Sequence, residues 1–104
     1  MKIIEQEEVR KLLQPKDCIQ LMAEALKGLE SGEYAQPARL ITVMPNTAKF
    51  GFMPAYVGDY FGAKVISAFA PNMGTKYPSH IGYVMLFESA HSTVAGMIEA
   101  GSIT

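Results

Sequence analysis

Residues 60–70 read YFGAKVISAFA and carry a single charge, Lys64, among β-branched, aromatic and small residues. Successive side chains of a strand point to opposite faces of a sheet. Lys64 would therefore share a face with Ile66, while Val65 and Ser67 point the other way. The stretch predicts a strand that sets a lysine on an otherwise apolar face.

The same period of two recurs along the chain after Gly32, and turn-forming residues separate the stretches that show it. Such a series of short β-forming stretches is typical of a sheet whose neighbouring strands are joined by hairpins. The strands that we expect are 39–44, 50–54, 63–69, 81–87 and 94–98, and residues 2–4 could add a short one.

Before Gly32 the apolar residues follow a helical period instead. We expect helices over residues 6–13 and 15–31, with Pro15 separating them and Gly32 ending the second. Two helices followed by a run of strands indicate an α+β fold. The helices should pack on one face of a mostly antiparallel or mixed sheet of about five or six strands.

Composition excludes several classes of protein. The chain has 104 residues, enough for one domain, and 49% of them are hydrophobic, with a net charge of −1. No basic stripe points to nucleic acid, and no apolar run approaches the roughly 20 residues of a membrane span. The acidic N-terminus does not resemble a targeting peptide, and the single cysteine, Cys18, allows no internal disulfide. We therefore expect a cytoplasmic protein.

Two cations are candidates for binding a substrate. Arg39 follows Pro37, whose ring fixes the backbone, so its guanidinium would leave a stiff loop in a defined direction and could grip a carboxylate. Lys64 would place a compact charge beside a pocket, ready for an acid or a carbonyl group. The residues alone leave the plainer alternatives open: a solvated arginine at a strand end, and a lysine that guards an edge strand against aggregation.

The remaining chemically active side chains are weaker candidates. His80 precedes a strand and His91 lies in a turn, where each is more simply explained as a solvated loop residue. Cys18 falls on the apolar side of the second helix and is better explained as a small buried residue than as a nucleophile. Glu88 and Glu99 stand apart near strand ends. No spacing typical of zinc ligands occurs, so we expect no metal site.

The order of four motifs resembles the ornithine cyclodeaminase and mu-crystallin family. Each motif is weak alone, but the likeness covers essentially the whole chain. The stretches that carry it are PAR at 37–39, FMPAY at 52–56, GAKVI at 62–66 with PN after it at 71–72, and EAGSIT at 99–104.

The resemblance implies roles for three residues. Arg39 and Lys64 match positions that hold the substrate's carboxylate, with Lys64 close to the reacting carbon and so a candidate catalytic residue. Met53 matches a position that lines the substrate pocket. The resemblance also implies that residues 1–104 form an N-terminal substrate-binding and dimerisation domain, truncated before the Rossmann domain that binds NAD or NADP.

The chain also departs from the family pattern. It has no Gly-x-Gly-x-x-Gly, so we expect no cofactor to bind this fragment and the fragment alone to be inactive. It stops before the arginine of the family's Thr-x-x-Arg-Thr motif. Gly51 stands where ornithine cyclodeaminases have a glutamate, so a smaller amino, keto or imino acid fits better than ornithine.

Two functions follow from these observations. The first is the front part of an NAD(P)-dependent oxidoreductase or deaminase that takes a small carboxylate-bearing substrate and forms a homodimer. The alternative is a non-enzymatic ligand-binding or dimerisation module, such as the remnant of a truncated gene.

Overall fold

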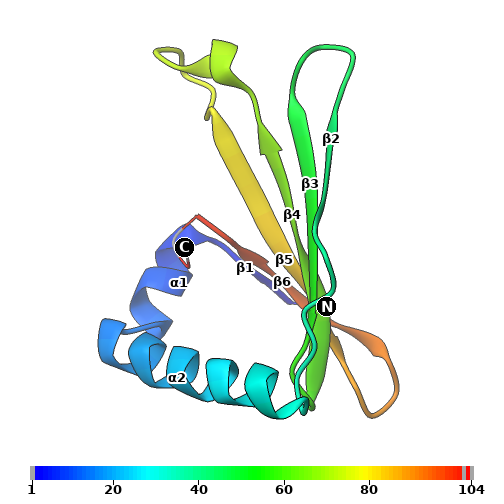
Figure 1. Ribbon diagram of the computed structural model, residues 1–104. Coiled ribbons are helices and arrows are strands. Elements are labelled where there is room, and N and C mark those ends of the chain that lie inside the picture. The colour runs from blue at the N-terminus through cyan, green and yellow to red at the C-terminus, as the bar shows by residue number, and fades with distance from the viewer. Residues whose placement is uncertain (1, 102, 104) are drawn as a thin grey trace.

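The computed structural model describes residues 2–101 and 103. A six-stranded sheet and two helices on one side of it make up the fold (Figure 1). The elements are β1 (Lys2–Ile4), α1 (Gln6–Leu12), α2 (Pro15–Ser31), β2 (Leu40–Val43), β3 (Lys49–Tyr56), β4 (Tyr60–Ala68), the 3-10 turn η1 (Ala70–Asn72), β5 (His80–Glu88) and β6 (Thr93–Glu99).

The sheet has the order β1-β6-β5-β4-β3-β2. Strands β2 to β6 form an antiparallel meander, and β1 joins the far edge parallel to β6. The short strand at the N-terminus is therefore real and makes the sheet mixed. The predicted α+β class is confirmed, and the described residues contain no Rossmann domain.

Strands β3, β5 and β6 are longer at both ends than the sequence predicted, β4 begins earlier, and β2 is shorter. Strands β3 and β4 continue to a hairpin turn at Gly58-Asp59, where the Val57 amide donates to the Tyr60 carbonyl at 2.8 Å. Gly58 has a φ of 84°, which this tight turn requires and which glycine adopts freely. Cross-strand pairing therefore continues until the turn geometry itself stops it.

Pro54 was expected to end its strand but lies inside β3. Bonded and non-bonded pairs alternate along an antiparallel ladder, so the nitrogen of Pro54 faces away from β4. On that side β2 begins only at Leu40, opposite Phe52. Pro54 therefore removes no hydrogen bond of the sheet, which is why β3 tolerates it.

Other bounds differ by one or two residues. α1 ends at Leu12, one residue earlier than expected, and β2 begins at Leu40, so Arg39 directly precedes it. The final stretch of the family resemblance, 99–104, includes residues 102 and 104, which lie outside the described residues.

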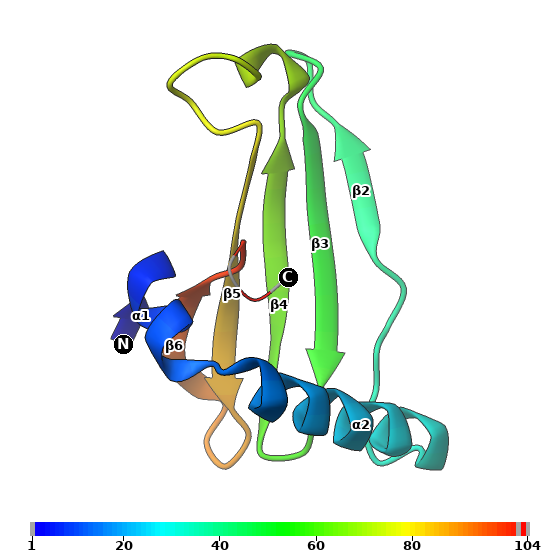
Figure 2. The same cartoon turned by 90° about the vertical axis from the view of Figure 1, so that its left-hand side faces the viewer.

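The helices cover one face of the sheet only in part. α1 packs beside β6, and its Val9 is 4% exposed. α2 begins at Pro15 and ends at Gly32, whose φ is 85°. Figures 1 and 2 show α2 crossing the lower end of the sheet on the same side as α1. Near its C-terminal end, the buried Gly28 lies against the ring of Tyr34.

The described residues enclose a small core. The hydrophobic residues that are buried are Val9, Ala48 and Ala100, and no large side chain among the described residues is fully buried. Large apolar side chains stay exposed on α2, where Ile19 is 72% exposed, and on the sheet. Exposed apolar area of this extent is characteristic of surfaces that bind another protein surface.

The carboxylate of Glu88 organises the turn between β5 and β6. Its Oε1 accepts hydrogen bonds from the amide and the hydroxyl of Thr93, at 2.9 and 2.7 Å, and its Oε2 accepts one from the His91 amide at 2.9 Å. The hydrogen bonds from Thr93, followed by that from His91, lower the pKa of Glu88 below its ordinary value of 4.5.

We expect Glu88→Gln to destabilise the protein at neutral pH, because an amide has one acceptor oxygen where the carboxylate has two. A carboxylate whose folded pKa is lowered stabilises the fold above its unfolded pKa and loses that effect as pH falls through the folded value. The difference between wild type and variant should therefore shrink below about pH 4.5. Urea midpoints across pH would measure it, with the exposed Glu30→Gln as control. A difference that stays constant from pH 7 to pH 3 would contradict this role.

Candidate functional site

The structure brings the three predicted substrate-binding residues to neighbouring strands. Met53 on β3 is the direct cross-strand partner of Lys64 on β4. Arg39 directly precedes β2, whose first residue, Leu40, is opposite Phe52. Arg39, Met53 and Lys64 are here named the cation row.

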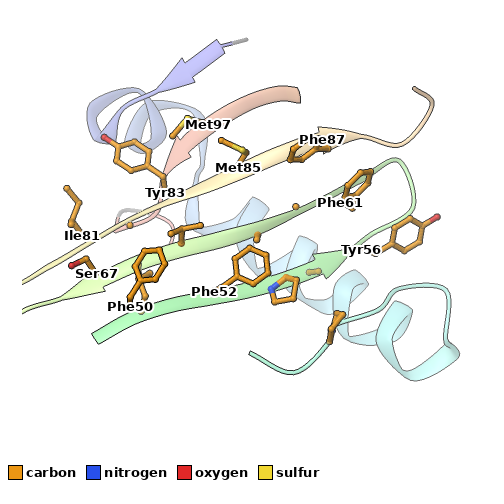
Figure 3. Close-up of a pocket in the computed structure, with 18 of the residues that line it drawn as sticks. Phe50, Phe52, Tyr56, Phe61, Ser67, Ile81, Tyr83, Met85, Phe87 and Met97 are labelled. Carbon is orange, nitrogen blue, oxygen red and sulfur yellow. The ribbon is translucent and has the colours of Figure 1, made fainter. Parts of the chain in front are cut away.

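Met53 and Lys64 of the cation row lie on the side of the sheet that the helices occupy, here named the helix face. In Figure 3 the helices pass behind the sheet, and the labelled side chains, including Phe52 and Ser67, lie in front of it. Phe52 precedes Met53, and Ser67 lies three residues after Lys64. Because side chains alternate along a strand, Met53 and Lys64 point to the helix face.

Neither cation of the row is neutralised by the protein. Among residues 2–101 and 103, Arg39 and Lys64 form no ion pair and no side-chain hydrogen bond. Lys64 is half-buried, and its cross-strand neighbours on the helix face are Met53 and Val84. A half-buried ammonium group without a counter-charge favours an anion from solution.

The geometry of the row suits a small carboxylate. Arg39 and Lys64 lie two strands apart, about 10 Å between their backbones at the usual strand spacing. Both side chains are long enough to meet at a shared anion above Met53. A guanidinium can hold both oxygens of a carboxylate at once, and an ammonium adds a point charge.

An apolar hollow lies on the opposite face, here named the open face (Figure 3). It measures about 730 Å³, and none of the residues that line it is charged. Arg39, Met53 and Lys64 do not line it. The hollow is lined instead by apolar side chains of β3, β4 and β5, among them Phe50, Phe52, Tyr83 and Met85. It therefore fits an apolar surface better than a carboxylate.

The structure also assembles a polar cluster that the sequence did not reveal. The Tyr83 hydroxyl donates to Oε2 of Glu5 at 2.8 Å, and Tyr83 is the cross-strand partner of Glu99. This hydrogen bond to Glu5, then burial, then the charges of Glu5 and Glu99 raise the pKa of Tyr83 above 10.0. Glu99 is thus not isolated. Nothing local in the sequence indicates the cluster, because β1 and β6 meet from opposite ends of the chain.

The structure assigns His80, His91 and Cys18 no shared site. His80 is exposed with its Nδ1 at 3.2 Å from the Ser79 hydroxyl, and the exposed His91 lies 3.8 Å from Glu88. Cys18 is a free, half-buried thiol. Across the described part of the chain, no three His, Cys, Asp or Glu side chains gather as metal ligands.

The described residues do not fit a dinucleotide. β1 leads into α1 through Glu5 without a glycine-rich loop, and the acidic Glu5, Glu7 and Glu8 at the start of this helix would repel a pyrophosphate. No helix of the described structure is long and apolar enough to cross a membrane.

These features agree with what comparison with known proteins shows. The family model described as "Ornithine cyclodeaminase/mu-crystallin family" matches residues 1–104. The chain belongs to this family. Comparison with curated proteins gives no match.

Solved structures share the fold at low sequence identity. An archaeal alanine dehydrogenase dimer with bound NAD is 20% identical with a TM-score of 0.89, over 96% of this chain and 31% of that one. The Δ(1)-pyrroline-2-carboxylate reductase of Thermococcus litoralis, in complex with NADH and L-proline, is 22% identical with a TM-score of 0.89, over 97% and 32%. The iminosuccinate reductase of Paracoccus denitrificans in complex with NAD+ is 14% identical with a TM-score of 0.89, over 97% and 32%. This chain therefore spans about a third of the length of each.

Proposed function

We propose that this chain is the substrate-binding and dimer-forming domain of a cytoplasmic NAD- or NADP-dependent enzyme that acts on a small amino, keto or imino acid. The observation that carries the proposal is the cation row, in which Arg39 and Lys64 lie near Met53 without a counter-charge from the residues that the structure describes. The family and the fold support it. The similar structures are a dehydrogenase and two reductases with bound nicotinamide cofactor.

Each residue of the row has a distinct proposed role. Arg39 holds the carboxylate of the substrate through two parallel hydrogen bonds. Lys64 donates to the same carboxylate and lies beside the reacting carbon, where it orients the imine or carbonyl and assists proton transfer. Met53 lies between the two cations and provides an apolar wall.

The nicotinamide cofactor supplies the hydride when bound, and residues outside this chain would have to hold it. This chain's own contribution is to bind and orient the acid. We therefore expect these 104 residues alone to bind carboxylates but to show no turnover and no affinity for NAD or NADP.

The open face is the proposed dimer surface. Two of its aromatic side chains are Phe50, which is 46% exposed, and Phe52, which is 44% exposed. A second copy of the chain presents the same apolar face. Packing the two faces against each other around a two-fold axis would remove both faces from water. The alanine dehydrogenase of the same fold is described as a dimer.

A ligand-binding and dimerising module without enzymatic activity is the second candidate. The observation that favours it is that the described residues keep an unneutralised cation row but do not fit a dinucleotide. Both candidates require the row to bind an acid, and they differ in whether hydride transfer follows.

Titration of the protein with pyruvate, L-alanine and L-proline, followed by NMR, tests the shared step. We expect saturable shifts at the amides of β3 and β4 around Met53 and Lys64. Methylammonium, which lacks a carboxylate, serves as the negative ligand. Shifts spread evenly over the surface, or confined to the open face, would overturn the assignment of the row.

A further inference from the structure

A second row crosses the helix face directly beside the cation row. It consists of Ile41, Gly51, Ile66 and Gly82, which are successive cross-strand partners on β2 to β5. Ile66 follows Lys64 by two residues on β4, so it points to the same face about 6.6 Å further along the strand. A ligand that is held at Lys64 therefore meets Ile66 next.

Ile66 lies between two buried glycines. A Cβ atom at Gly51 would come within 2.8 Å of Cγ1 of Ile66, and one at Gly82 within 2.7 Å of its Cγ2. The two branches of Ile66 thus extend over both glycines and fill the space that side chains would take. Because a β-branched side chain has few rotamers, this cover is stiff.

The chemistry of the second row is entirely apolar. An ammonium or carboxylate at the far end of a substrate would lose water over Ile66 without gaining a hydrogen bond. The next row along the strands contains Lys49, the β3 partner of Ala68, so a cationic substrate end would approach a further positive charge. A short hydrocarbon side chain loses no hydrogen bonds to water over Ile66 and is not repelled by the positive charge beyond it.

We propose that Ile66, seated between Gly51 and Gly82, selects substrates whose side chain is a small uncharged hydrocarbon. The inference rests on the proposed binding of the carboxylate by the cation row. It makes Ile66 a specificity-determining residue that disfavours amino acids with a charged side chain, basic ones most strongly because Lys49 also repels them.

Three amino acids that differ mainly at the end of the side chain test this. L-Norvaline, L-ornithine and L-glutamate share the α-amino acid group, and ornithine is norvaline with a terminal ammonium. NMR titrations of the wild-type protein should give norvaline the tightest binding, by about tenfold over ornithine, with glutamate between the two. In Ile66→Ala that preference should fall severalfold, and in Ile66→Glu ornithine should gain relative to norvaline.

Val65→Ala is the matched control, because it truncates the neighbouring residue of the same strand on the opposite face. It should keep the wild-type preference. Equal binding of norvaline and ornithine by the wild type, or an unchanged preference in Ile66→Ala, would overturn the role of Ile66 while leaving the cation row intact. Failure of all three amino acids to bind, or full binding by Arg39→Ala, would overturn the proposed function itself.

Discussion

Lys64→Ala is expected to weaken binding of pyruvate or L-alanine by about 2–5 kcal/mol, which is the usual cost of truncating one partner of a desolvated charge pair. Since 1.4 kcal/mol is a factor of ten, this corresponds to at least about a 20-fold rise in Kd. The physical reason is that Lys64 is half-buried and has no partner within the described protein. Its charge is therefore available to the ligand and is only partly screened by water.

Two further variants separate charge from shape. Lys64→Met keeps an unbranched chain without the ammonium group, so it should lose as much affinity as the alanine variant. Arg39→Lys keeps the charge but not the planar fork, and it should lose less than Arg39→Ala. The control is Lys76→Ala, which removes the same charge from a loop lysine that lies against Tyr77. Equal affinity in Lys64→Ala and Lys76→Ala would remove Lys64 from the site.

The second large effect is expected at the open face. We expect wild-type protein to be a dimer at micromolar concentration and Phe52→Asp to be largely monomeric. The variant sets a carboxylate in the middle of an apolar surface, and two-fold symmetry places it there in both copies. Burying an unpaired charge costs several kcal/mol, so the dimer Kd should rise at least about 100-fold. Analytical ultracentrifugation over a concentration series measures both constants.

Ile19→Asp provides the matched control for the dimer. It introduces the same charge at an apolar side chain on α2 that is even more exposed than Phe52. It should leave the dimer intact. A monomeric wild type would refute the dimer, and dissociation by Ile19→Asp alone would move the interface from the open face to α2.

The resemblance and the periodicity predicted much of the site's content. The motifs at residues 37–39, 52–56 and 62–66 indicate the residues proposed for the row, which are Arg39, Met53 and Lys64. The alternation of side chains within residues 60–70 predicted that Lys64 and Ile66 point to the same face of the sheet. The cross-strand register of β4 agrees with this prediction. What could not be predicted is that Ile66 faces Gly51 on one side and Gly82 on the other, because cross-strand pairing depends on where each hairpin turns.

The stretch at residues 60–70 by itself determined a strand, a lone lysine and the face that this lysine shares with Ile66, because strand alternation is a local property of the backbone. Local patterning likewise determined both helices and the α+β class. Tertiary structure decided which side of the sheet the helices take, that the apolar hollow lies on the face opposite Lys64, and that Tyr83 meets Glu5. These features depend on the pairing of β1 with β6 and on the hairpin registers. Such pairings form between residues far apart in the chain, and no local pattern encodes them.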